Sequence, residues 1–317
     1  MTASRVGFGI KTSQANTTYP EILRTWRDAD TIEAFEHAWL WDHMVPLRGP
    51  VTGPALEGWT LLAALAAQTT RLRLGIIVTD NRLRPPAVLA KMAATVDQVS
   101  GGRLVFGIGA GGSAVADPGA LALVRRELDG YGIEVVPTRD AIEALDEACR
   151  IARLMWTRDA PFDFEGRWYQ LRGAICEPKP IQRPGPPIMI GAGGQRSLRV
   201  VAEHADIWNC PTRGDVDEFR RMDAILVEHC QAIGRNPAHI ERSVQLLVGP
   251  EAPASEGDHR LPAIAGPAET RDRLQAFMEA GANHLVLAAV GPIGDRPARW
   301  LADEVVEPVL ASQRTST

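Results

Sequence analysis

Apolar positions follow two alternating patterns along this chain. Short apolar runs, rich in β-branched residues, are typical of strands that are buried on both faces. Longer segments, in which apolar residues recur every three or four positions, are typical of helices with one buried face. Both occur within residues 72–112, where a strand at 72–78 precedes a helix that Pro86 opens, and a second strand follows at 103–108. Two parallel strands joined by a helix form a βαβ unit.

The same alternation repeats along the chain. Strands are predicted at residues 5–10, 38–42, 72–78, 103–108, 188–190, 206–209, 244–248 and 284–290. Helical patterns follow them at residues 20–37, 59–68, 86–99, 138–156, 195–204, 216–233, 268–280 and 297–310. Eight such units predict an α/β fold with a closed (β/α)8 TIM barrel, so the 317 residues are expected to form one domain, 1–317. A doubly wound open sheet is the alternative, although it rarely needs eight regular units.

Two insertions interrupt the alternation. Residues 113–136, after the fourth strand, contain an extra helix around 121–128, and a loop rich in glycine, proline and serine follows the seventh strand. A hairpin at 162–169 and an extended, proline-rich connector at 177–187 are also predicted before the fifth strand. A loop over the barrel mouth shapes the substrate pocket, so specificity is expected to depend on the first insertion.

Composition narrows the class of protein. The formal net charge of -5 argues against a general nucleic-acid surface and suits a protein that handles small molecules. The four cysteines lie far apart without a C-x-x-C pair, so we expect reduced thiols and no metal. The first strand begins almost at the N-terminus, and no apolar run approaches the about 18 residues of a membrane helix. We therefore expect no signal peptide, no membrane segment and a cytoplasmic protein.

In such a barrel the active site lies at the carboxyl ends of the strands. Two of these ends are rich in glycine: residues 107–112 let a flat ring or phosphate approach the backbone, and residues 191–194 lead into a helix N-terminus, which favours anions. Tight barrel turns also need glycine, which is the alternative interpretation. The other candidates at strand ends are Lys11, Thr12, Ser13, Asp42, His43, Thr79, Asp80, Asn81, Trp208, Asn209 and Cys210.

His43 is the sharpest chemical candidate. It follows Asp42 just beyond a strand, where an imidazole can give or take a proton near neutral pH. A hydrogen-bonded loop histidine without a chemical role is the alternative. His37 is predicted at a helix end outside the barrel, and His284 begins a strand at the opposite rim. Trp39, Trp41 and Trp208 have the shape to line a pocket for an aromatic ring, although such residues commonly pack in cores.

Longer motifs connect these candidates. They include Trp41-Asp42-His43, Leu74-Gly75-Ile76-Ile77-Val78-Thr79, Ser100-Gly101-Gly102-Arg103-Leu104, Gly107-Ile108-Gly109-Ala110-Gly111, Phe164-Glu165-Gly166-Arg167-Trp168-Tyr169, Ile188 to Gly194 and Ala205-Asp206-Ile207-Trp208-Asn209. Together these motifs resemble the luciferase-like monooxygenase superfamily, and within it most of all the coenzyme F420-dependent oxidoreductases. The resemblance covers nearly the whole chain, and it implies a (β/α)8 barrel with a flavin or deazaflavin across the strand ends.

The resemblance also implies roles for individual residues. A non-proline cis peptide between Ile77 and Val78 would back the cofactor ring, and the Gly109-Ala110-Gly111 loop would contact the ring or the ribityl chain. Backbone N–H groups of Gly193 and Gly194 would bind the cofactor phosphate. Asp42 and His43 would lie beside the ring and act on the substrate. The remaining cofactor-binding residues expected are Thr79, Asn81, Gly191, Ala192 and Trp208.

The expected activity is hydride transfer between coenzyme F420 and a small organic substrate, with His43 supplying or removing the proton. Two alternatives stay open: a two-component monooxygenase that uses reduced FMN and oxygen, and a non-catalytic flavin-binding barrel. Relatives that oxidise sugar phosphates carry a glutamate directly after the glycine loop, where this chain has Gly112, which puts that substrate in doubt. Relatives often dimerise through barrel helices, so a homodimer is one oligomeric state that the resemblance implies.

Overall fold

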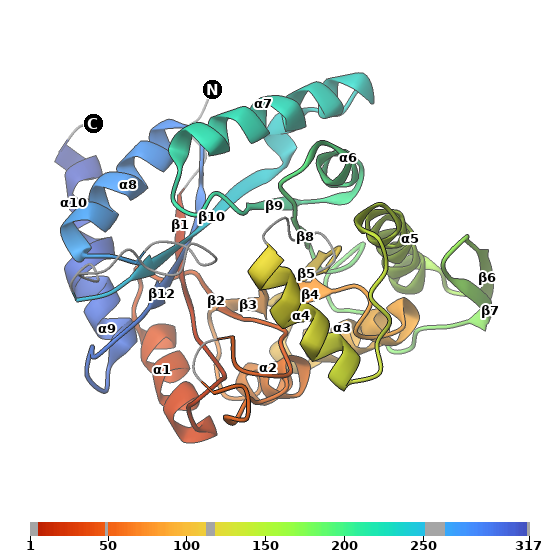
Figure 1. Cartoon of the computed structure of the whole chain (residues 1–317), viewed down its shortest axis with the longest axis horizontal. Helices are drawn as coiled ribbons and strands as arrows, with labels where there is room; N and C mark the ends of the chain where they lie inside the picture. The colour runs from red at the N-terminus through yellow and green to blue at the C-terminus, as the bar shows by residue number, and fades with distance from the viewer. Residues whose placement is uncertain (1–5, 48–49, 112–117, 251–263, 316–317) are drawn as a thin grey trace.

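Figure 1 shows the computed structural model of the chain, which describes residues 6–47, 50–111, 118–250 and 264–315. The strands of the barrel wall are β1 (Gly7–Lys11), β2 (His37–Leu40), β3 (Arg73–Ile76), β5 (Leu104–Gly109), β8 (Ile188–Gly191), β9 (Ile207–Cys210), β10 (Glu241–Val248) and β12 (His284–Ala289). Each strand pairs in parallel with the next, and β12 pairs with β1, so the sheet closes on itself. The predicted (β/α)8 barrel is therefore confirmed.

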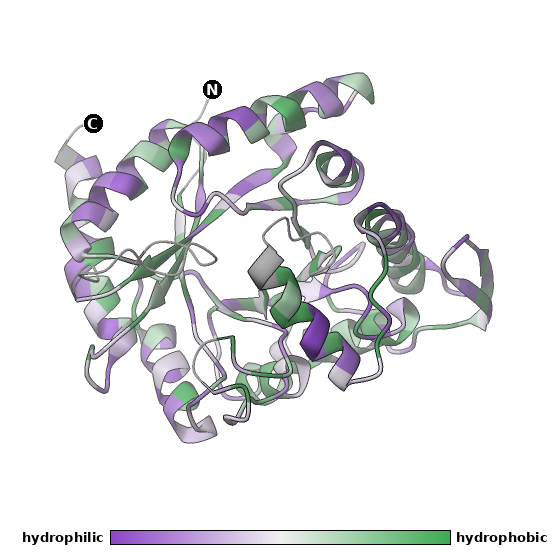
Figure 2. Ribbon diagram, viewed as in Figure 1, coloured by the Kyte–Doolittle hydropathy of each residue, from purple (hydrophilic) through white to green (hydrophobic). Residues whose placement is uncertain are grey.

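Helices surround the wall in Figure 1. They are α1 (Tyr19–Thr31), α2 (Gly58–Ala66), α3 (Pro86–Ser100), α5 (Thr138–Thr157), α6 (Gln195–His204), α7 (Val216–Ala232), α8 (Pro267–Glu279), α9 (Pro297–Leu301) and α10 (Glu307–Thr315). A π-helical turn, Ala302–Val306, joins α9 to α10. In Figure 2, α7 and α8 carry both purple and green residues, as helices that bury one face should.

The barrel interior has a core of its own. Its buried residues are Trp39, Ile77, Val105, Met189, Ile207 and Val286, with Val78 packed against them. A second core lies between the strands and the helices, where the indoles of Trp26, Trp59 and Trp156 are buried. Side chains thus fill the barrel below its mouth, as they do in other barrels of this type.

The boundary between α1 and β2 corrects the sequence prediction. α1 ends at Thr31 rather than at residue 37, and β2 begins at His37. The side chains of Ile32 and Phe35 continue the apolar spacing of the helix, but the chain turns there, and the Phe35 N–H donates to the Ile32 carbonyl (3.1 Å). Both side chains are buried, so core packing explains their spacing. His37 is therefore a buried strand residue and not a residue on an outer helix.

The third strand is also shorter than predicted. β3 ends at Ile76, a cis peptide joins Ile77 to Val78, and β4 (Thr79–Asp80) continues the strand and pairs with β5. The non-proline cis bond that the resemblance implied is thereby confirmed. Among the other strands, β10 begins at Glu241, earlier than the predicted 244, and β2 ends at Leu40, earlier than the predicted 42.

The insertions follow the predicted plan. α4 (Pro118–Gly130) is the extra helix expected after the fourth strand, and Figure 1 shows it in front of the wall strands. β6 (Phe162–Glu165) and β7 (Gln170–Ala174) form the predicted hairpin, which projects at the right of the view. After the seventh strand, β11 (Ile264–Ala265) pairs with β10. The rest of that loop, residues 251–263, and Gly112 lie outside the described residues.

Candidate active site

The Ile77–Val78 segment forms a ledge at the carboxyl end of β3. The Ile77 N–H donates to the Leu40 carbonyl (2.9 Å), which ties the ledge to the end of β2. A Cβ atom added to Gly107 would lie 1.8 Å from the Ile76 carbonyl oxygen, and one added to Gly109 would lie 2.8 Å from Val78 Cγ2. Glycine is therefore required at both positions so that β5 can approach the ledge.

The glycine-rich end of β8 also leaves room for the ledge, at Gly191. A Cβ atom added to Gly191 would lie 2.9 Å from Val78 Cγ2, so Val78 fills the space that Gly107, Gly109 and Gly191 leave. These glycines thus have a packing role, as the alternative interpretation expected. Ala110 is buried and Gly111 is half-buried at the end of β5, next to the ledge.

Asp42 is held by Arg84, from the loop between β4 and α3. Its carboxylate accepts two hydrogen bonds from Arg84, at 2.7 and 3.1 Å, and Arg84 also pairs with Glu57 at the N-cap of α2. Burial raises the pKa of the Asp42 carboxyl, and hydrogen bonds from Arg84 and Thr79 partly offset that effect. The contacts of Asp42 are those of a residue that holds the loop after β2 in place.

His43 is held by a carboxylate from α4. Its Nδ1 lies 2.8 Å from Glu127 Oε2, and the other oxygen of Glu127 accepts a hydrogen bond from the Met44 N–H. The Glu127 side chain is 4% exposed and that of His43 is 29% exposed. The imidazole therefore has one edge fixed in the protein and part of its surface open to solvent.

Trp41 lies beside this histidine, with ring centroids 5.1 Å apart. Its backbone N–H and carbonyl are both bound by the buried Gln14 side chain, which fixes the residue. The Trp41 Nε1 atom is buried and finds no hydrogen-bond partner among the described residues. A buried donor of this kind normally has an acceptor, so a ligand oxygen or nitrogen beside His43 would satisfy it.

Three predicted cofactor residues lie in the wall rather than at its surface. Thr79 and Asn81 are fully buried, and the Thr79 hydroxyl accepts a hydrogen bond from Trp59 Nε1 (2.8 Å). Trp208 is also fully buried, stacks on Phe219 of α7 (5.6 Å between centroids) and donates to the Ala192 carbonyl (2.8 Å). This placement corrects the expectation that Trp208 lines a pocket, because its indole points into the outer core and supports the loop that contains Ala192.

The N-terminus of α6 is exposed. Gly194 is the N-cap residue, and Gly193, Gly194 and the first turn of the helix are accessible to solvent. The N–H groups of a first helical turn lack partners within the helix and carry the positive end of its dipole. The Gly194 N–H donates to Ser197 Oγ (3.2 Å), so a phosphate would have to compete with that hydroxyl for one of the two predicted N–H groups. An exposed helix N-terminus of this kind can hold an anion.

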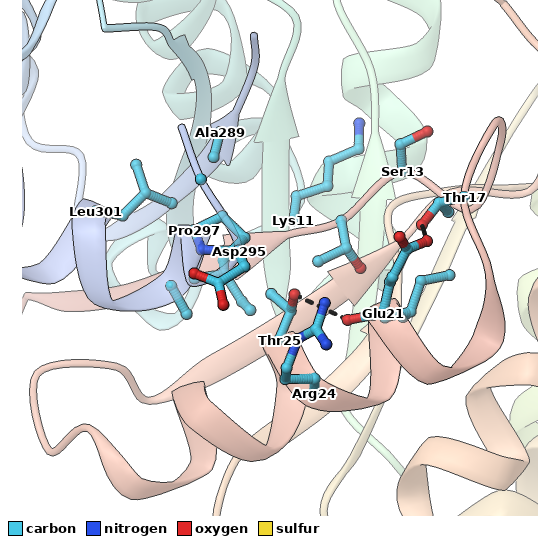
Figure 3. Close-up of a pocket in the computed structure, with 15 residues that line it drawn as sticks. Lys11, Ser13, Thr17, Glu21, Arg24, Thr25, Ala289, Asp295, Pro297 and Leu301 are labelled. Atoms are coloured by element: carbon cyan, nitrogen blue, oxygen red, sulfur yellow. Dashed lines mark hydrogen bonds between the residues drawn. The ribbon is translucent and has the colours of Figure 1, made fainter. Parts of the chain in front are cut away.

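A cavity of about 400 Å³ lies at the same end of the barrel, between α1 and α9. Figure 3 shows that Lys11, Ser13, Glu21, Arg24 and Asp295 line it. Lys11 Nζ donates to Gln245 Oε1 (2.9 Å) from β10, so this predicted strand-end residue crosses to another wall strand. Because the cavity contains both acidic and basic groups, it suits a polar ligand of mixed charge rather than a simple anion.

Other features lie away from this mouth. A cavity of about 870 Å³ opens at the opposite end, among the first residues of the strands, where barrels of this type do not place their chemistry. Among the described residues, Asp146, Glu203 and His204 form one group with metal-ligand atoms, on α5 and α6 outside the barrel. In the part of the chain that the structure describes, no helix is both long enough and apolar enough to cross a bilayer. The homodimer remains a prediction.

Sequence reasoning identified Asp42 and His43 but not their partners. Arg84 and Glu127 are distant in sequence, and a single arginine or glutamate in a loop or helix gives no signal of a pair. The only available signal for Glu127 was its place in the insertion after the fourth strand, which was expected to lie over the mouth. The hydrogen bonds between α4 and the loop after β2 support that expectation.

Comparisons with known proteins agree with this architecture. The chain is 31% identical over 213 residues to the phthiodiolone/phenolphthiodiolone dimycocerosates ketoreductase of Mycobacterium sp. (strain JLS), covering 63% of this chain and 49% of that protein. It is 29% identical over 216 residues to the F420-dependent glucose-6-phosphate dehydrogenase of Kineococcus radiotolerans, covering 68% and 59%. The chain therefore spans about half of the length of these curated relatives.

Two further comparisons cover most of the chain. The structure of an F420-dependent secondary alcohol dehydrogenase, in complex with an F420-acetone adduct, superposes with a TM-score of 0.79 at 18% identity, over 97% of this chain and 99% of that one. At that identity the superposition shows a common fold. Residues 2–283 match the luciferase-like monooxygenase family. The chain therefore belongs to the luciferase-like monooxygenase family.

Proposed function

We propose that this chain is a coenzyme F420-dependent oxidoreductase that transfers a hydride between the deazaflavin and a small organic substrate at the barrel mouth. The observation that carries the proposal is the arrangement of the Ile77–Val78 ledge and His43. The ledge follows β3 and His43 follows the adjacent strand β2, at the same end of the barrel. The Ile77 N–H donates to the carbonyl of Leu40, the last residue of β2, and so connects the two strand ends. An apolar side chain and an imidazole thus follow adjacent strands at one end of the barrel, which supports the proposal.

Three features of the mouth fit a bound deazaflavin. The half-buried Val78 side chain offers apolar surface above the interior core, on which a flat ring can rest. The Trp41 Nε1–H is a buried donor without an acceptor among the described residues. The exposed N-terminus of α6 would offer N–H groups to a phosphate, which would have to displace Ser197 Oγ from the Gly194 N–H.

The roles of the residues follow from these contacts. A bound deazaflavin would supply or accept the hydride. His43 would give or take the accompanying proton at the reacting oxygen or nitrogen of the substrate, because part of its ring is exposed while the Nδ1 edge is fixed. Asp42, held by Arg84, would fix the position of the loop after β2 relative to the ledge.

The names of the relatives support the proposed cofactor, F420, more than they support any particular substrate. The Kineococcus relative is named as F420-dependent, and the superposed dehydrogenase contains an F420 adduct. Their substrates differ, and the chain covers only 59% of the Kineococcus protein. We therefore propose a small molecule with a carbonyl, imine, activated alkene or alcohol group, and not one of the relatives' own substrates.

A reduced-FMN monooxygenase is the second candidate, since the family that matches residues 2–283 is described as luciferase-like monooxygenase. FMN also has a flat ring and a phosphate, so the ledge and the α6 N-terminus would suit it too. The non-catalytic flavin-binding barrel is less well supported, because the partly exposed His43 imidazole is paired with the Glu127 carboxylate at the same end of the barrel as the ledge.

Titration of the purified protein with coenzyme F420 and, separately, with FMN, followed by ligand fluorescence, tests the proposal. We expect tight binding of F420 and weak binding of FMN. Reduced F420 should then be consumed with an enone, imine or ketone, or oxidised F420 with an alcohol. Preference for FMN would instead favour the monooxygenase, and binding of neither compound would overturn both candidates.

A further inference from the structure

We propose that Glu127, from the insertion after the fourth strand, is a positioning residue that fixes His43 in the tautomer with its proton on Nδ1. The free Nε2 atom then becomes the proton-transfer atom. This inference rests on the proposed function, because it assigns the atom of His43 that acts on the substrate. It also gives a specific task to α4, the segment whose role the sequence left open.

The carboxylate of Glu127 is itself held at two points. Oε2 lies 2.8 Å from His43 Nδ1, and Oε1 accepts the hydrogen bond of the Met44 N–H. With a side chain that is 4% exposed, Glu127 has little freedom to turn toward solvent. The hydroxyl of Tyr131, the residue that follows α4, donates to the Met44 carbonyl (3.4 Å), so the insertion binds both the N–H and the carbonyl of Met44.

These contacts decide where the proton of His43 lies. An ionised carboxylate can only accept hydrogen bonds, so a contact of 2.8 Å requires the proton on Nδ1. In a neutral imidazole the Nε2 atom then carries the free lone pair. The Trp41 ring on one side of the imidazole restricts its rotation, so the tautomer and the ring orientation are fixed together.

The assignment gives a balanced reaction. When an alcohol is oxidised, its C–H bond breaks and the hydride passes to the deazaflavin, while its O–H bond breaks and the proton passes to His43 Nε2. When a carbonyl is reduced, the hydride forms the new C–H bond and the Nε2–H of the imidazolium gives the proton to oxygen. Glu127 stays a carboxylate in both directions, where it stabilises the imidazolium that forms or reacts.

The first experiment reads the tautomer in the wild-type protein and uses one variant for signal assignment. In protein labelled with ¹⁵N at its histidines, long-range ¹H–¹⁵N spectra at pH 8 distinguish the two neutral tautomers, and the His43→Gln variant assigns the His43 signals among the seven histidines. We expect the Nδ1–H form for His43. The Nε2–H form, or a mixture of both tautomers, would overturn the inference even if the enzyme is active.

The Glu127→Gln variant tests the same point from the other side. The Met44 N–H needs an acceptor, so the amide oxygen of the new side chain should face Met44 and its NH₂ group should face His43 Nδ1. The imidazole must then accept at Nδ1, and its proton should move to Nε2. Glu134→Gln, an exposed change of the same charge in the same segment, is the matched control and should leave the spectrum unchanged.

Activity separates the two proposals. We expect Glu127→Gln to lower kcat about 10- to 100-fold while the Kd for F420 stays within twofold of the wild-type value. Equal kcat in Glu127→Gln and Glu134→Gln would overturn the positioning role. If the wild-type protein binds no F420 but His43 is found as the Nδ1–H form, the proposed function fails while the tautomer assignment holds.

Discussion

The His37 imidazole stacks on the His284 imidazole, with ring centroids 3.8 Å apart and an angle of 5° between the ring planes. They come from β2 and β12, on either side of β1, where Gly9 leaves room for them: a Cβ atom there would lie 1.8 Å from His37 Nδ1. Trp39 Nε1 donates to His37 Nδ1 (2.7 Å), and His284 Nδ1 lies 2.9 Å from Ser243 Oγ. Burial lowers the pKa of His37 well below its ordinary value and that of His284 to about 3.

Acid should therefore destabilise the protein through this pair. Because the folded-state pKa values are depressed, the unfolded chain binds more protons below about pH 6.5, and stability falls as the pH drops from there toward about 3. At pH 5 His284 should cost about 2 kcal/mol relative to pH 7, and His37 should add to the loss in the same direction. Urea unfolding at pH 7 and pH 5 measures the loss, which should shrink in His284→Phe and stay unchanged in His239→Gln, at an exposed site. An equal loss in all three proteins would contradict this account.

Removing one partner of the Asp42–Arg84 pair should destabilise the protein. The Asp42 side chain is fully buried and that of Arg84 is 12% exposed, so Arg84→Met would leave a buried carboxylate with much less compensation. We expect it to lower the free energy of unfolding by about 3–5 kcal/mol in urea. Arg82→Met, in the same loop, controls for the loss of a charge.

The matched double variant separates the pair from its packing. Asp42→Leu combined with Arg84→Met removes both charges, so its loss of stability should be smaller than that of Arg84→Met alone. If the double variant is less stable than Arg84→Met, the carboxylate contributes in another way, and the pair is not what holds the loop after β2.

His43→Ala should separate proton transfer from cofactor binding. If His43 gives or takes the proton of the reaction, kcat should fall by about 100-fold or more. The Kd for F420, measured by fluorescence, should change little, because the ledge and the α6 N-terminus remain. His239→Ala, at the opposite end of the barrel, should leave both values intact. Unchanged kcat in His43→Ala would remove this residue from the mechanism.

The fold could be predicted from the sequence because burial on both faces gives a strand a continuous apolar run, and burial on one face gives a helix its period. The pattern fails where buried residues lie outside a regular element. Ile32 and Phe35 kept the helical spacing through a turn, which misplaced His37 and concealed its stack on His284.

The site could be predicted only in part, for a similar reason. His43 and the cis bond before Val78 belong to local motifs that one stretch of sequence displays. The groups that hold them come from far along the chain: Arg84 is 42 residues from Asp42, and Glu127 is 84 residues from His43. Periodicity cannot report contacts between loops, because loop conformation depends on tertiary packing. The sequence also could not decide between a ligand-binding role and a packing role for the glycine motifs. In the structure, Val78 fills the space beside Gly107, Gly109 and Gly191.

The N-terminus of α6 allows the phosphate proposal to be tested by charge alone. Gly194 has an extended backbone (φ -119°, ψ 157°), and a Cβ atom there would meet only Ser197 Oγ at 3.8 Å. Both Gly194→Asp and Gly194→Asn should therefore fit and cap the helix, since both residues are favoured at the N-cap. The two variants differ by one negative charge and hardly in shape.

That charge should repel a bound phosphate. We expect F420 to bind at least about tenfold more weakly to Gly194→Asp than to Gly194→Asn, a difference of about 1.4 kcal/mol. The difference should shrink at about 0.5 M salt, because the repulsion is between partly exposed charges. A deazaflavin without a phosphate should bind both variants equally, which controls for changes at the ring. Equal F420 affinity in the two variants would show that the phosphate lies elsewhere, and the ledge and His43 would then have to be explained without this helix.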